Sequence, residues 1–210
     1  MAVRLLVASR NAKKLAELQR VLDAEGITGI QPVSLADVPD FPEAPEDGAT
    51  FAENALIKAR SGARATGLAC LADDSGLTVD ALNGMPGVLS ARWAGRHGDD
   101  AANNALLLAQ LSDVPDERRG AAFVSVCALA GPGVPGGEAT AEGRWSGSVL
   151  RAPRGDGGFG YDPLFLPAGQ PAGAGRAAAE LDPAEKDAQS HRGRALRALV
   201  PALRELTARA

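Results

Sequence analysis

Apolar and polar residues alternate in blocks along the 210-residue chain, and the blocks have the lengths of strands and helices. Residues 4–8 form a short apolar run that predicts a buried strand. Residues 9–26 carry apolar side chains at helical spacing before a glycine, which predicts a helix: Leu15, Leu18, Val21 and Leu22. A strand, a polar turn and a helix in this order are typical of the start of an α/β fold.

The next part of the chain gives a second helix and a second strand. Residues 31–49 hold five acids and four prolines and are expected to form a loop or a short irregular strand. The sequence Thr50-Phe-Ala-Glu53 is a capping box, which predicts a helix to about Thr66. Residues 68–72 then read as a strand, so that "ADDSG" at 72–76 stands at its end. A further helix is predicted in "DDAANNALLLAQL".

From residue 120 onward the pattern is strand-like and rich in turns. The segments "AAFVSVCALA" and "EATAEGRWSGSV" flank a Gly/Pro turn and predict an antiparallel hairpin. A glycine-rich loop follows, and the chain closes with a capped helix from Pro183 and a last helix kinked at Pro201. Neither a repeat nor a linker divides the sequence. It predicts an α/β protein with one domain over residues 1–210.

Composition and charge exclude several classes of protein. The net charge of −4 and the isoelectric point near 5.3 argue against a nucleic-acid partner, which would favour a basic surface. No apolar stretch reaches the length of about 20 residues that a membrane span needs, and no signal peptide is visible. Cys70 and Cys127 lack metal-type spacing and read as buried thiols. We therefore expect a soluble cytoplasmic protein without a membrane partner.

The chain uses arginine for most of its positive charge, since 18 of its 22 basic residues are Arg. Lys is a compact point charge that binds phosphate, whereas Arg is a planar fork. The positions that remain lysine are therefore candidates for phosphate contacts, although four residues are few enough for chance: Lys13, Lys14, Lys58 and Lys186.

Three of these lysines lie in or near segments that could bind an anion or a metal ion for other reasons. "SRNAKK" at 9–14 joins the first strand to the first helix, where free backbone N–H groups favour an anion. "ADDSG" supplies carboxylates suited to Mg²⁺ beside phosphate oxygens. Lys58 shares a helix face with Asn54, and Glu46 is an acid in the preceding loop. An ordinary helix cap, an Asx turn and plain surface are the alternatives for these segments.

Two later segments offer groups that suit a nucleobase. "GDGGFGYDP" combines glycines, which permit close backbone approach, with the aromatic residues Phe159 and Tyr161. "KDAQSHRGRAL" places Lys186, His191 and Arg192 near the start of the last helix. A flexible turn with Phe159 in the core and a capped surface helix are the alternatives.

Together, five segments in this order resemble the inosine/xanthosine triphosphate pyrophosphatase family: "ASRNAKKLAEL", "TFAENALIKAR", "LADDSGLTVDALNGMPGVLSARWAG", "GGFGYDPLF" and "KDAQSHRGRAL". The resemblance runs from Leu6 to about Leu199. It implies an elongated, two-lobed α/β domain with a central mixed sheet flanked by helices, an active site in the cleft between the lobes, and a homodimer.

The resemblance also implies a role for each matching residue. The phosphates would be held by Ser9, Asn11 and Lys14, although Ser9 and Arg10 replace the family's usual Thr and Gly. Asp74 would accept a proton and, with Glu46, hold Mg²⁺. Further substrate contacts would come from Ser75 and Lys58. The purine and sugar would be bound by Phe159, Gly160, Tyr161, Asp162, Lys186, His191 and Arg192.

The implied reaction is hydrolysis of ITP, dITP and XTP to the monophosphate and pyrophosphate. Donors at His191 or Arg192 would favour the 6-oxo group of these purines over the 6-amino group of adenine. Two alternatives stay open: a pyrophosphatase for another modified nucleotide, and a nucleotide sensor without turnover. The combination of Asp74, Lys14 and Lys58 favours an enzyme.

Overall fold

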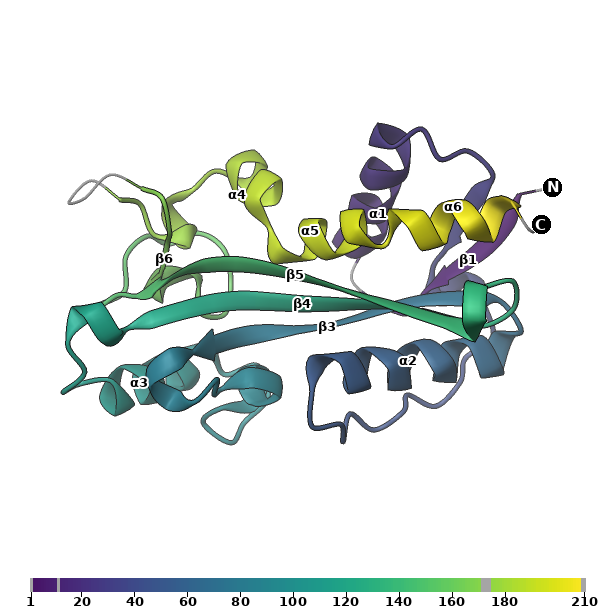
Figure 1. Ribbon diagram of the computed structural model, residues 1–210. Coiled ribbons are helices and arrows are strands. Elements are labelled where there is room, and N and C mark those ends of the chain that lie inside the picture. Colours follow the sequence, from purple (N-terminus) through teal and green to yellow (C-terminus); the bar gives the residue numbers. More distant parts are fainter. Residues whose placement is uncertain (1, 11, 171–174, 209–210) are drawn as a thin grey trace. The chain divides into compact units, whose positions relative to one another are not determined.

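The computed structural model describes residues 2–10, 12–170 and 175–208 (Figure 1). The strands of the described part are β1 Val3–Val7, β2 Ile30–Val33, β3 Ala69–Val79, β4 Gly120–Ala130, β5 Glu138–Val149 and β6 Phe165–Pro167. The α-helices are α1 Ala12–Ala24, α2 Phe51–Thr66, α3 Asp100–Gln110, α4 Pro183–Gln189, α5 His191–Ala198 and α6 Val200–Ala208. None of the described helices is long and apolar enough to cross a membrane.

The strands form one sheet in the order β2-β1-β3-β4-β5-β6. β1 runs parallel to both β2 and β3, and its Leu6 lies opposite Val33 and Cys70. β6 pairs antiparallel with β5. The mixed sheet with helices between its strands confirms the predicted α/β class.

The helix ends follow the local signals in the sequence. Thr50 and Glu53 form the predicted capping box of α2, and Gly67 closes this helix with φ of 69°. Asp182 accepts a hydrogen bond from the backbone N–H of Glu185 at 2.8 Å, as expected for the start of α4. The predicted kink is a break: α5 ends at Ala198, and α6 starts one residue before Pro201.

The main difference from the sequence prediction concerns β3. The predicted strand ends at residue 72, but β3 continues through both acids to Val79. Beyond the acids, Leu77 and Val79 alternate with more exposed residues, so that the pleat and a buried face persist. Aspartate is depleted in strands, which is why the sequence pattern indicated an end there.

The described chain divides into two compact units. Unit 1 comprises residues 1–74, 125–143 and 192–210, and unit 2 comprises residues 75–124 and 144–191. The single domain with its two lobes and cleft stays a prediction.

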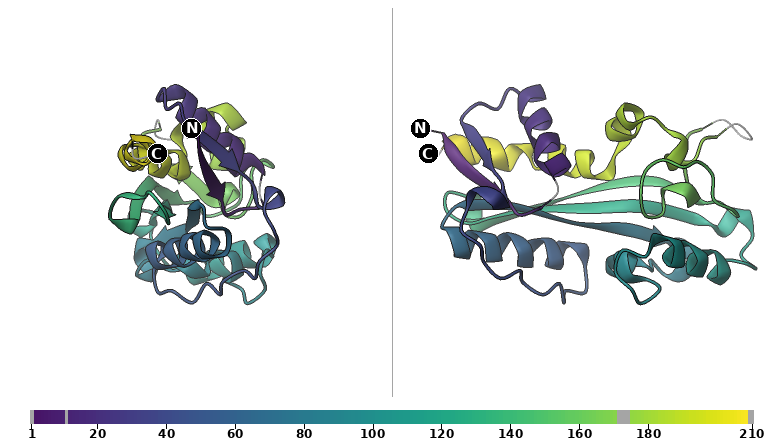
Figure 2. Two further views of the ribbon diagram at one scale, coloured as in Figure 1. Left: turned by 90° about the vertical axis from the view of Figure 1, so that its right-hand side faces the viewer. Right: turned by 180° about the vertical axis from the view of Figure 1, so that it is seen from behind.

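Unit 1 has an apolar core on each face of its strands. α2 covers one face, and α1, α5 and α6 cover the other, as Figures 1 and 2 show. Leu5 packs with the second group of helices, whereas its neighbour Leu6 packs toward Ala63 of α2. This alternation is the period-two pattern of a strand that is buried on both faces.

Unit 2 is built around aromatic side chains and α3. The ring of Phe123 on β4 lies 4.7 Å from that of Phe165 and 6.3 Å from that of Trp145, between centroids. Leu107 of α3 and Leu111, which directly follows this helix, are fully buried in the same cluster. These side chains form the apolar core of unit 2.

Candidate functional site

The two acids of β3 belong to different clusters. Lys14 Nζ donates a hydrogen bond to Asp73 Oδ2 at 2.7 Å, and Arg192 Nε lies 3.4 Å from the same oxygen. Arg192 also pairs with Glu17 of α1. Burial by itself raises the pKa of Asp73, but Lys14 and Arg192 outweigh it and leave that pKa below its usual value. Asp73 is therefore a buried carboxylate that stays ionised.

Asp74 faces α2. Lys58 Nζ donates to Asp74 Oδ1 at 3.1 Å, and Asn54 Nδ2 donates to Asp74 Oδ2 at 3.2 Å. Glu46 Oε1 lies 3.4 Å from Lys58 Nζ, so one ammonium contacts both acids. Burial raises the pKa of Asp74 and the negative charge of Glu46 adds to this, while Lys58 and Asn54 act in the opposite direction. A carboxylate with a raised pKa in such a cluster is a candidate general base.

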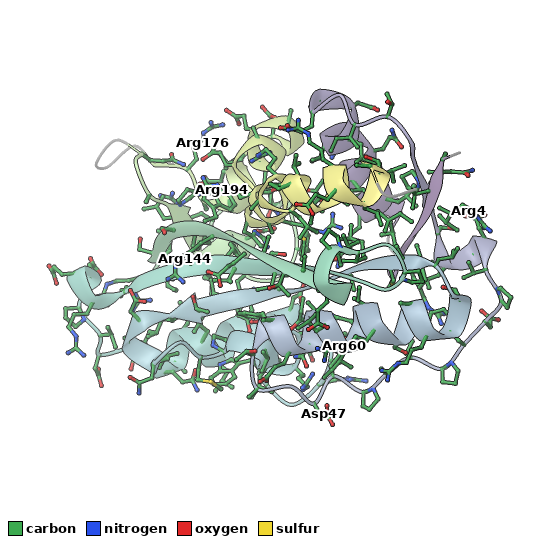
Figure 3. All side chains as sticks on the ribbon, turned by 45° about the vertical axis from the view of Figure 1, so that its right-hand side comes forward. Arg4, Asp47, Arg60, Arg144, Arg176 and Arg194 are labelled. Carbon is green, nitrogen blue, oxygen red and sulfur yellow. The ribbon has the colours of Figure 1, made fainter. Side chains whose placement is uncertain are left out.

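The first turn of α2 anchors the loop that carries Glu46. Asn54 is buried, and its Oδ1 accepts a hydrogen bond from the Gly48 backbone N–H at 2.9 Å. A Cβ on Gly48 would lie 2.7 Å from this oxygen, so only glycine fits without displacement. Asp47 points outward into solvent (Figure 3). Asn54 thus links the Glu46 loop directly to Asp74.

The residues around Asp74 fit a magnesium ion. Asp74 and Glu46 are hard oxygen donors, and both carboxylates contact the same ammonium. Mg²⁺ is commonly held by one or two carboxylates, with substrate phosphates and water completing its shell. Among the described residues, no group of three or more acidic, His or Cys side chains is placed to hold a metal ion.

The glycine-rich loop of unit 2 presents an exposed aromatic ring. Phe159 is 77% exposed, and Lys186 Nζ lies 4.6 Å from the centroid of its ring. Lys186 pairs with buried Asp162, whose Oδ2 also accepts a hydrogen bond from the Phe159 N–H at 2.8 Å. Gly158 has φ of +78°, and a Cβ there would lie 2.2 Å from Asp162 Oδ2. Phe159, Asp162 and Lys186 therefore form one local cluster.

Two neighbours in this loop serve to anchor it. The Gly160 N–H donates to Asp100 Oδ2 at 2.7 Å, and its carbonyl accepts from Asn104 Nδ2 at 3.0 Å. Tyr161 is buried, and its hydroxyl donates to the Ser90 carbonyl at 2.9 Å. Burial raises the pKa of this phenol. The predicted substrate contacts of Gly160 and Tyr161 stay predictions, and for Tyr161 the phenol is part of the core.

The remaining predicted residues have different local surroundings. The half-buried His191 ring stacks on Phe123 at 5.3 Å between centroids. Ser75 is exposed on β3. Ser9 follows β1 and lines a cavity of about 400 Å³ together with Arg10, Ser34 and Phe41 among others. Asn11 lies outside the described residues.

Three of the interacting residues have no role predicted from the sequence: Glu17, Asn54 and Asp73. Asn54 had a usable signal, because it stands four residues before Lys58 on the same helix face. Glu17 stands three residues after Lys14, which also places it on the same face of α1. Asp73 is the first acid of the "ADDSG" motif, but its pairing with Arg192 is a tertiary contact that local sequence patterns do not encode.

The sequence of this chain is similar to those of bacterial dITP/XTP pyrophosphatases. It is 68% identical over 204 residues to a dITP/XTP pyrophosphatase of Mycobacteroides abscessus, covering 97% of this chain and 96% of that protein. It is 69% identical over 206 residues to a dITP/XTP pyrophosphatase of Nocardia farcinica, covering 98% and 97%.

Solved structures support the same relationship. A nucleoside-triphosphatase / dITP/XTP pyrophosphatase from Mycobacterium abscessus superposes with a TM-score of 0.80 at 67% identity, covering 96% of this chain and 100% of that one. A HAM1 protein from Coxiella burnetii gives 0.81 at 44% identity, covering 97% and 99%. The model of the Ham1 family matches residues 5–202. This chain therefore belongs to the Ham1 family.

Proposed function

We propose that this protein hydrolyses the non-standard purine nucleoside triphosphates ITP, dITP and XTP to the monophosphate and pyrophosphate. The observation that carries the proposal is Asp74: a carboxylate with a raised pKa, held by Lys58 and Asn54 and close to a second acid. The names of the similar proteins supply the substrate class.

In the proposed reaction a water oxygen attacks the α-phosphorus. The bond between that phosphorus and the oxygen bridging to the β-phosphorus breaks, and pyrophosphate leaves with the bonding electron pair. Asp74 orients the water and accepts its proton; a raised pKa makes the carboxylate a stronger base. Ser9, Asn11, Lys14, Lys58 and Ser75 contact the triphosphate, because catalysis at phosphorus depends mainly on positioning and charge.

We also propose that the enzyme depends on Mg²⁺, held by Asp74 and Glu46. When bound, Mg²⁺ supplies positive charge to the phosphate oxygens. Lys58 contacts both of the carboxylates that would hold the ion.

The purine contacts come from the residues of the two later motifs. Phe159 stacks on the base, and Gly160, Tyr161, Asp162, Lys186, His191 and Arg192 complete the base and sugar contacts. The guanidinium of Arg192 is engaged by Glu17 and Asp73, so its purine contact stays a prediction with a specific test. If Arg192→Ala left the ratio of ITP to ATP turnover unchanged, whatever the overall rate, Arg192 would have no role in base discrimination.

We also propose a cellular location and an oligomeric state. The nucleotide pool of the cytoplasm is where such a hydrolase would act, and the family resemblance favours a homodimer. Light scattering on the purified protein tests the dimer directly: a molecular mass near that of one chain, 21.4 kDa, would reject it.

The deciding experiment is pyrophosphate release from a panel of ITP, XTP, dITP, GTP, ATP and dUTP, with Mg²⁺ and with EDTA, for the wild type and Asp74→Asn. Metal-dependent turnover of ITP, XTP and dITP, lost in the variant, supports the proposal. Turnover of another base keeps the chemistry and rejects the substrate class. Tight nucleotide binding without turnover identifies a sensor instead.

A further inference from the structure

We propose that Asp73 is a positioning residue for Lys14: its carboxylate, itself fixed by Arg192, holds the Lys14 ammonium where the triphosphate binds. The inference rests on the proposed function, because it assumes that Lys14 contacts phosphate. It concerns an acid to which neither the family motif nor the mechanism above gives a task.

The geometry fixes Lys14 at both of its ends. Its Nζ donates to Asp73 Oδ2 at 2.7 Å, and its backbone carbonyl accepts a hydrogen bond from Arg192 Nη1 at 3.3 Å. Arg192 Nε lies 3.4 Å from the same Asp73 oxygen. This Nε–Oδ2 contact is an ion pair without a hydrogen bond, and Glu17, on the same helix as Lys14, binds Arg192 Nη1. One arginine therefore secures both the main chain and, through Asp73, the side chain of Lys14.

Exposure separates the group that can meet a ligand from the groups that support it. The Lys14 side chain is 29% exposed, whereas those of Asp73 and Arg192 are 3% and 9% exposed. Asp73 therefore acts on a ligand through Lys14 and does not contact it. The lysine ammonium has three donors, and the bond to Asp73 uses one of them. The other donors are available to phosphate oxygens.

Holding the ammonium in advance has a physical benefit. A lysine side chain has four rotatable bonds, and ordering it only when the substrate arrives would cost conformational entropy. Displacing a positioning group by about 1 Å can cost about 100-fold in rate. Loss of Asp73 is therefore expected to lower kcat more than it raises KM.

The competing explanation is a purely structural ion cluster that joins α1, β3 and α5. Buried charges that lose their partner destabilise a fold, whatever the role of a neighbouring lysine. The two explanations differ in one respect: only the positioning role requires that the effect of Asp73 on catalysis depend on Lys14.

A double-mutant cycle measures that dependence. Asp73→Asn, Lys14→Ala and the double variant are compared with wild type by pyrophosphate release from ITP with Mg²⁺, using only the folded fraction of each preparation. We expect Asp73→Asn to lower kcat/KM by about 10- to 100-fold in the wild-type background. With Lys14→Ala already present, the further loss is expected to be less than about threefold.

Equal losses in the two backgrounds would overturn the positioning role and leave a structural one. Should Asp73→Asn fail to fold, Glu17→Gln enters the same cycle, because Glu17 secures the Arg192 that fixes Asp73. A loss of at least about threefold that disappears with Lys14→Ala supports the inference; an equal loss in both backgrounds, or no loss, rejects it. A wild type that releases no pyrophosphate would instead refute the proposed function.

Discussion

Asp73 and Asp74 are adjacent in β3, yet their carboxylates point to opposite faces of the strand and pair with different lysines. Asp73 meets Lys14 of α1, and Asp74 meets Lys58 of α2. Side chains alternate along a strand, so two neighbours in regular β structure meet different helices. The acid that accompanies Asp74 is Glu46, from a loop.

This arrangement predicts opposite effects of two conservative substitutions on stability. The lowered pKa of Asp73 means that its ionised form stabilises the fold above pH about 3.8, and this contribution is lost as pH falls through the lowered value. The raised pKa of Asp74 means that its contribution is present below about 3.8 and is lost as pH rises through the raised value. Of these two carboxylates, only that of Asp73 therefore adds stability at pH 7.

We therefore expect Asp73→Asn to destabilise the protein at pH 7 by about 1–3 kcal/mol, because Lys14 loses a charge-assisted hydrogen bond and buried Arg192 keeps only Glu17. Asp74→Asn is expected to leave the melting temperature unchanged or to raise it. Denaturant unfolding of both variants at pH 7 measures these changes in stability. Below pH about 3.8, the loss of stability in Asp73→Asn should become smaller. A comparable loss in both variants would contradict the assignment.

The pKa of Asp74 should respond in opposite directions to its two charged neighbours. Glu46→Gln removes a negative charge and is expected to lower this pKa, and Lys58→Ala removes a positive charge and is expected to raise it. Carbon-detected NMR of the carboxyl groups in the metal-free protein, assigned with Asp74→Asn, measures both shifts. Shifts of the same sign would show that the charges of Glu46 and Lys58 do not control Asp74.

Much of this site follows from local sequence, and the rest depends on tertiary contacts. The α2 capping box and the helix face shared by Asn54 and Lys58 are short-range features, which is why the sequence predicted where Lys58 lies. The course of β3 through the acids was not predictable, since local propensity disfavours Asp in strands and burial of Leu77 and Val79 overrides it. The pairing of Arg192 with Asp73 joins distant parts of the chain, so the periodicity of the sequence does not predict it.

Gly48→Ala should impair the enzyme without touching the substrate. The added Cβ would lie 2.7 Å from Asn54 Oδ1, so the loop must shift and carry Glu46 away from Asp74. We expect the Mg²⁺ concentration for half-maximal activity to rise about 10-fold or more, because orienting groups around metal ligands typically matter on that scale. Ala49→Ser, at the next and exposed position, is the matched control. An unchanged metal requirement would show that the loop does not hold the metal.

Phe159→Ala should separate recognition of the base from recognition of the phosphates. The ring is 77% exposed and lies beneath Lys186, and stacking of a base on an aromatic ring is worth about 1–3 kcal/mol. We expect kcat/KM for ITP to fall about 5- to 150-fold, as that energy implies. Inhibition by tripolyphosphate, which has no base, should keep its constant within about twofold, a shift within the usual scatter for independent sites. Phe159→Trp keeps a stacking surface and should retain most of the activity. If Phe159→Ala weakened ITP turnover and tripolyphosphate inhibition equally, Phe159 would act by ordering the loop around Asp162 and Lys186, not by stacking on the purine.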